Sequence, residues 1–154
     1  MGEVLPFEQG PNLDNFKKGF FVVCRSIKDN ELLMRDSISF HLFMWMMVEA
    51  SYENRQQWKK TGNGKILIDI KVGQLLFGIK SASQATDISE KSLRNRIKLF
   101  EKEKIITVKR AHQYSLITIC NYNPYQDFES YKGTARVVAR GVAHNYKESK
   151  HNKL

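Results

Sequence analysis

The order of local signals in residues 80–121 constrains the fold more than any other part of the chain. Residues 81–86 predict a short helix that ends in a tight turn at Asp87, a residue type that tolerates a left-handed backbone. Ser89 can then accept hydrogen bonds from free first-turn amides, so we place the second helix at residues 90–104. This stretch predicts a helix-turn-helix.

A β-hairpin is predicted directly after the second helix. Residues 105–110 and 114–121 are rich in β-branched and aromatic side chains, and a three-residue linker of a common hairpin length separates them. The hairpin would form a wing beside the helix-turn-helix. Lys109 and Arg110 stand at the turn end of its first strand, where they could reach a nucleic-acid backbone.

The second helix has one apolar side and one cationic side. At about 100° per residue, Leu93, Ile97 and Phe100 share one side and should be buried. Lys and Arg neutralise phosphates, and Arg and Asn also bond bidentately to guanine and adenine edges. The side chains expected to face DNA from this helix are Lys91, Arg94, Asn95, Lys98 and Lys102.

A Lys-rich and Arg-rich amphipathic helix is, by itself, equally typical of a solvated surface. The turn before it and the hairpin after it favour the DNA-binding interpretation. From the preceding short helix we add Ser83 and Gln84 as candidate DNA contacts.

Another helix is predicted earlier in the chain, over residues 38–52. It is apolar on two faces, and Asp36 or Ser37 can cap it. Such a helix either lies in the centre of the core or packs against a second subunit. Three methionines would also suit an adaptable self-association surface. A place in the core is the favoured interpretation of this helix; as the alternative, the sequence predicts a homodimer interface made by Phe40, Phe43, Met44 and Met47.

The fold class is predicted as α+β, a winged helix-turn-helix with a small antiparallel sheet. Residues 65–70 and 74–79 read as two strands, whereas the polar residues 53–64 read as a loop that ends in a Gly-Asn-Gly turn. Residues 1–18 are expected to form a flexible acidic arm, 19–126 the DNA-binding domain and 127–154 a basic tail.

The formal net charge of +9 favours a polyanionic partner, and the positive charge is clustered. Residues 90–110 hold eight Lys or Arg against three Glu. Cys24 and Cys120 are isolated among apolar neighbours, which indicates structural thiols in a reducing compartment and a cytoplasmic protein. We expect no membrane span, no metal site, no cofactor and no enzymatic activity, because neither ligand spacing nor a catalytic constellation is present.

The chain resembles the winged-helix N-terminal domain of phage replisome organisers and DnaD-like primosomal proteins over residues 19–126. The most specific segments are VGQLLFG before the helix-turn-helix and ITICNYNPYQ, which closes the wing. The resemblance implies a recognition helix at residues 90–104, a wing at 105–121 and frequent self-association. Those proteins typically carry a further C-terminal helical domain, where this chain has a short basic tail, so a full helicase-loading role is not implied.

The expected function is duplex DNA binding in replication initiation or maintenance of a phage or plasmid-like mobile element, with replisome proteins as further partners. One alternative is a transcriptional regulator of such an element. Another is a winged-helix module that docks on a protein. Scattered aromatic residues, Trp58 among them, could stack on single-stranded bases, but packing in the core and turns is the interpretation favoured by their spacing.

Overall fold

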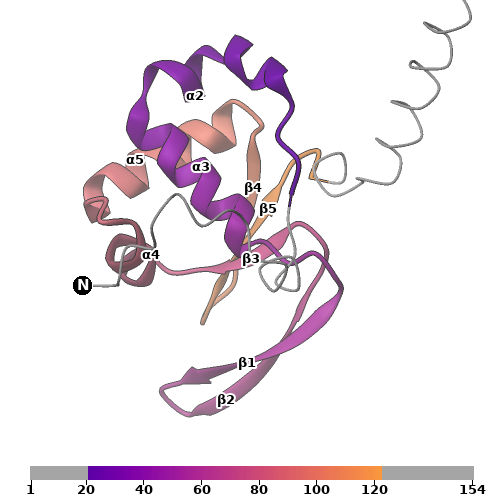
Figure 1. The fold of residues 1–154 in the computed structure, drawn as a ribbon. Coiled ribbons are helices and arrows are strands. Elements are labelled where there is room, and N and C mark those ends of the chain that lie inside the picture. Colours follow the sequence, from indigo (N-terminus) through magenta and orange to yellow (C-terminus); the bar gives the residue numbers. More distant parts are fainter. Residues whose placement is uncertain (1–20, 123–154) are drawn as a thin grey trace, which may run out of the picture.

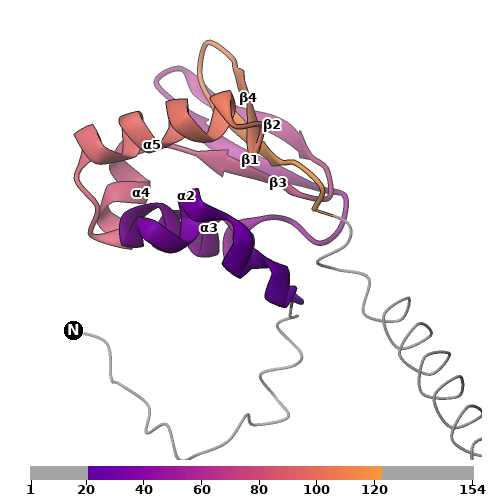
Figure 2. The same ribbon diagram turned by 90° about the horizontal axis from the view of Figure 1, so that it is seen from above.

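The computed structural model describes residues 21–122, which form helices on one side of a small antiparallel sheet and a separate hairpin on the other (Figures 1 and 2). The fold class is α+β, as predicted. The elements in chain order are η1 (Arg25–Asp29), α2 (Glu31–Arg35), α3 (Ser37–Glu49), β1 (Arg55–Thr61), β2 (Gly64–Ile70), β3 (Gln74–Phe77), α4 (Ile79–Thr86), α5 (Glu90–Lys102), β4 (Ile106–Arg110) and β5 (Ser115–Ile119).

The main sheet has the strand order β3-β5-β4, and all its pairs are antiparallel. Ile117 of β5 lies opposite Leu75 of β3 and opposite Val108 of β4. Strand β3 precedes α4 and α5 in the chain, yet it pairs with the last strand. The segment that holds α4 and α5 therefore begins and ends in the same sheet, which fixes the two helices against one face of it.

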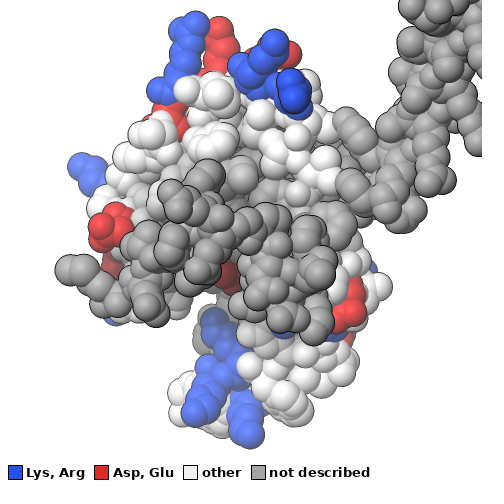
Figure 3. All heavy atoms as spheres, in the orientation of Figure 1, with Lys and Arg blue, Asp and Glu red and all other residues white. Residues whose placement is uncertain are grey.

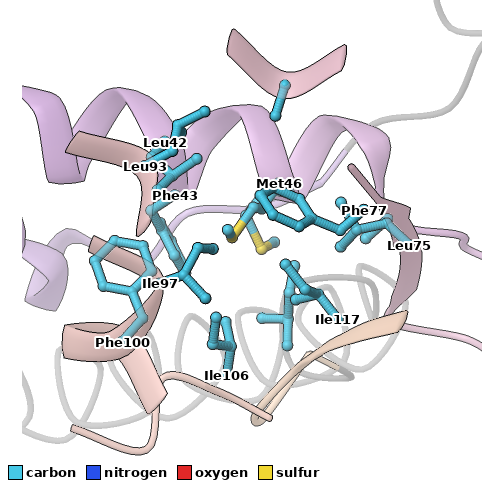
Figure 4. Packing of buried hydrophobic residues seen from close by; sticks show 14 of the residues in the cluster. Leu42, Phe43, Met46, Leu75, Phe77, Leu93, Ile97, Phe100, Ile106 and Ile117 are labelled. Atoms are coloured by element: carbon cyan, nitrogen blue, oxygen red, sulfur yellow. The ribbon is translucent and has the colours of Figure 1, made fainter. Parts of the chain in front are cut away.

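The core lies between α3, α5 and the sheet, and Figure 4 shows side chains from these elements converging. Leu93, Ile97 and Phe100 of α5 are buried, which confirms the apolar side predicted from the helical period. Leu42 and Met46 of α3 are completely buried beside them. Burying large apolar side chains such as these stabilises a domain by about 1.5–3 kcal/mol each.

The turn between α4 and α5 has the predicted geometry. Asp87 ends α4 with a φ of 58° in the left-handed region, and Ile88 is buried at the junction. Ser83 Oγ donates to the Ile88 carbonyl at 2.6 Å, and Ser89 Oγ accepts from Ser92 N at 3.2 Å as the N-cap of α5. Helix α5 ends at Lys102, two residues earlier than predicted.

Helix α3 is shorter than predicted and lies deeper in the monomer. It runs over Ser37–Glu49, because the backbone turns extended at the C-cap Ala50. Phe43 and Met47, which were assigned to a homodimer interface, are only 4% and 2% exposed and belong to the core. That assignment is corrected, since side chains packed on the sheet of their own chain offer nothing to a second chain.

Strand β1 corrects the expectation of a loop over residues 53–64. Its sequence RQQWKKT is polar and lacks the alternation of a half-buried strand. It pairs with β2 along its whole length, and the predicted glycine-rich turn joins the two strands. Hydrogen bonding to an apolar neighbour, rather than its own pattern, makes this segment a strand. The strands expected at residues 65–70 and 74–79 are present, although Ile79 already begins α4.

The expected acidic arm and basic tail lie outside the described residues. Among residues 21–122, no helix is both long enough and apolar enough to cross a bilayer. Within the same range, no three His, Cys, Asp or Glu side chains gather where they could hold a metal ion.

Asp36 joins α3 to α5. Its carboxylate accepts from Ile38 N at 3.3 Å and Ser39 Oγ at 2.6 Å as the cap of α3, and it lies 2.6 Å from Arg96 Nε of α5. The Arg96 contact is ionic, because its N–H does not point along a hydrogen bond to any partner among the described residues. The Ser39 hydroxyl and then the Arg96 guanidinium hold the pKa of Asp36 below its ordinary value of 3.8, against the opposing effect of burial.

We expect Asp36→Ala to lower the free energy of unfolding by about 1–2 kcal/mol at pH 7, through loss of the cap and the ion pair. Because the pKa of Asp36 is lower in the folded state, its charged form stabilises the fold above pH 3.8, and this contribution is lost as the pH falls through the folded-state pKa. Urea unfolding should therefore separate variant from wild type at pH 7 and much less at about pH 2. Asp36→Asn keeps a capping side chain and should lose less, whereas a gap that does not change with pH would contradict this account.

Candidate nucleic-acid interface

The outer face of α5 carries the predicted cations together. The Ser89 cap and Glu90 in the first turn stabilise the helix start, and Lys102 stabilises its end, since these charges complement the helix dipole. With the apolar side of the helix anchored in the core, its other side is directed outward. Lys91, Arg94, Asn95, Lys98 and Lys102 are all exposed.

A groove runs between α5 and the sheet. Arg94 and Lys98 of α5 line one side, and Arg110 of β4 lines the other. Apolar side chains also line it, among them Phe77 and Val108. Three cationic residues around one groove, beside an exposed helix face, make an arrangement suited to an anionic ligand.

Arg110 is held toward α5 by a bidentate ion pair with Glu101. Its two terminal nitrogens lie 3.0 Å from the two carboxylate oxygens. This pairing lowers the pKa of Glu101 and raises that of Arg110. Glu101 therefore fixes the direction of the Arg110 side chain and neutralises part of its charge.

Lys109 and Arg110 stand at the end of β4, as predicted, but on opposite faces of the strand. Arg110 lies opposite Ser115 on the groove side, whereas Lys109 lies opposite Leu116. Successive residues of a strand point to opposite faces, so Lys109 is directed away from α5 and toward the β1–β2 hairpin. Only Arg110 of the pair can accompany the α5 residues.

Two other predicted residues have local partners. Arg94 pairs with Glu90 at 3.1 Å, but both side chains are about half exposed, so the pair is weak and open to exchange with a phosphate or a base. The Ser83 hydroxyl is half-buried and used in the helix-helix turn, so it is a structural group. Gln84 of α4 is exposed and free to approach a ligand beside α5.

Sequence reasoning missed the β1–β2 hairpin as part of the charged surface. Figure 3 shows Lys and Arg side chains gathered on this hairpin, at the bottom of the view. The exposed lysines of β1 and β2 include Lys60 and Lys65. Trp58 of β1, for which internal packing was the favoured prediction, is 63% exposed. Lys60 and Trp58 lie on β1, a segment predicted as a loop, so nothing in the sequence indicated that they stand beside Lys65 and Leu67.

Comparison of the chain with protein-family models, with curated proteins and with solved structures finds no match.

Proposed function

We propose that this domain is a winged helix that binds duplex DNA, with α5 as the recognition helix and the β4–β5 hairpin as the wing. One observation carries the proposal: the exposed cationic face of α5 continues into a groove that Arg94, Lys98 and Arg110 line. An α-helix fits the major groove of B-DNA, and the wing would then lie along the neighbouring backbone.

The α5 residues divide by chemistry into two groups. Lys91, Lys98 and Lys102 would bind phosphates, which position the protein without reading sequence. Arg94 and Asn95 carry the planar groups that bond bidentately to guanine and adenine edges. Gln84 and Arg110 would flank the helix on either side.

The sequence resemblance favours a role in replication initiation or maintenance of a phage or plasmid-like element over a role in transcription. The two roles differ in their binding sites. Iterated sites at an origin support the first, and a short palindrome that overlaps a promoter supports the second. Selection of bound fragments from random duplexes, followed by mapping of the recovered sites, distinguishes them.

Titration of duplex DNA across salt concentrations tests DNA binding itself. Five or six phosphate contacts predict a log–log slope of about −5, at roughly −0.9 per contact. Fluorescence anisotropy with a labelled blunt duplex measures this slope. An affinity for duplex DNA that does not change with ionic strength, or no measurable affinity for it, would instead support a protein-docking domain.

We also propose that the chain self-associates through the outer side of α3. With Phe43 and Met47 in the core, the remaining surface is a stripe at four-residue spacing, formed by Phe40, half-buried Met44 and Val48, which is 67% exposed. Light scattering that finds a monomer at high micromolar concentration would remove this part of the proposal.

A further inference from the structure

The outward face of the β1–β2 hairpin exposes an apolar pair. Trp58 of β1 lies directly opposite Leu67 of β2, and the two side chains are 63% and 44% exposed. Residues directly opposite in an antiparallel pair share one face, so these side chains form one small platform. Folding of the domain does not bury this indole.

Two lysines stand beside the platform on the same face. Lys60 and Lys65 are directly opposite each other, an arrangement of like charges that destabilises a hairpin unless an anion lies between them. No carboxylate within residues 21–122 forms an ion pair with either of them. The nearest acidic position on this face, Asp69, accepts a hydrogen bond from Gln56 at 2.7 Å.

The opposite face of the hairpin is anchored on the wing. Ile66, Ile68 and Ile70 form a second small core with Leu76 of β3, Leu116 of β5 and Tyr114 of the turn before β5. Because Ile66 and Tyr114 lie near the ends of the two hairpins, the hairpin tips are side by side, as both ribbon views show (Figures 1 and 2). The exposed platform is therefore held at a fixed place beside the wing.

An indole with lysines beside it has the chemistry of a base-stacking site. Stacking of a base on an aromatic side chain is independent of sequence, and the adjacent lysines neutralise the phosphates of the same strand. In an intact duplex the face of each base is covered by its neighbours, so an exposed indole gains a partner only where a base is unpaired. The charge at this face thus favours a nucleic acid, and the indole favours a single strand.

We propose that the outward face of the β1–β2 hairpin binds single-stranded DNA beside the duplex held by α5. Trp58, supported by Leu67, stacks on an unpaired base, and Lys60 and Lys65 bind the flanking phosphates. The location of this single strand next to a duplex rests on the proposed function, whereas the contact with a single strand does not. The preferred ligand of the full chain is then a duplex that carries a single-stranded tail.

The test compares three labelled ligands with the full chain by fluorescence anisotropy. The ligands are an oligo-dT strand, a blunt duplex and the same duplex with an oligo-dT tail. Trp58→Ala is expected to weaken binding of the strand and the tailed duplex about tenfold or more, with a change below about twofold on the blunt duplex. Trp58→Tyr should restore most of the loss because it keeps an aromatic face. Because the Trp58 side chain is largely exposed, the midpoint temperature of thermal unfolding of both variants should match that of wild type.

Several results would overturn the proposal. One is equal binding of the strand by wild type and Trp58→Ala, and another is an equal loss on all three ligands, which would make this face a general phosphate contact. A Trp58-dependent affinity for anionic phospholipid vesicles, with none for oligo-dT, would assign the face to a membrane surface.

Failure of the blunt duplex to bind, with Trp58-dependent binding of the strand intact, would reject the proposed function of α5 and leave the hairpin site standing.

Discussion

Exchange of Lys91 and Lys98 for glutamate is expected to lower the affinity for duplex DNA roughly 100-fold at low salt. Both side chains project from the exposed face of α5, and under the proposed function charge reversal would replace two phosphate contacts by two repulsions. The slope of log affinity against log salt should also become shallower by about two. Anisotropy titrations at several salt concentrations measure both quantities.

A matched control separates local contacts from total charge. Arg25→Glu with Lys28→Glu, two exposed positions on η1, lowers the net charge by the same amount. This control should reduce affinity only a fewfold, by its effect on the overall field. An equal loss in both double variants would show that DNA responds to net charge and not to the α5 surface.

Replacement of Gly73 by alanine is expected to lower the free energy of unfolding by about 3 kcal/mol. Gly73 has a φ of +79°, which costs other residues about 1–2 kcal/mol, and an added Cβ would lie 2.9 Å from the Cβ of buried Tyr122. The position cannot shift freely, because its N–H donates to Ser51 O at 2.8 Å and its carbonyl accepts from Ile119 N at 2.9 Å. Since domains of this size have only about 5–15 kcal/mol of stability, the midpoint temperature of thermal unfolding should fall by about 10 °C or more.

Two other glycines provide the controls for this prediction. Gly64 also has a positive φ, of +136°, but open space around its Cα, so Gly64→Ala measures backbone strain alone. Gly62 has neither feature, and Gly62→Ala should change stability little. If the Gly73 and Gly64 variants lose equal stability, the close approach of Tyr122 contributes nothing.

Features that depend on a few consecutive residues could be predicted from the sequence. The Ser89 cap, the left-handed Asp87 and the burial of Leu93 and Phe100 all follow from local chemistry and helical period. The outward direction of the cations of α5 then follows from the same period, since burial of one side of a helix exposes the other.

Residues whose environment is set by a distant segment could not be predicted in this way. Strand β1 is polar apart from Trp58, and only its pairing with β2 makes it a strand and sets Trp58 opposite Leu67 on an exposed face. An apolar residue such as Phe43 suits a core and a subunit interface equally well, so the sequence pattern could not show that it belongs to the core.

The chain by itself thus determined the helices α4 and α5 with the turn between them, the helix caps and the cationic side of α5, because these result from interactions a few residues apart. The tertiary structure decided which cations share a surface. Packing of the sheet against α5 decides that Arg110, and not Lys109, lies on the groove side, and Glu101 then holds Arg110 toward α5. The physical reason is that a strand has two faces and its own sequence does not say which one meets the core.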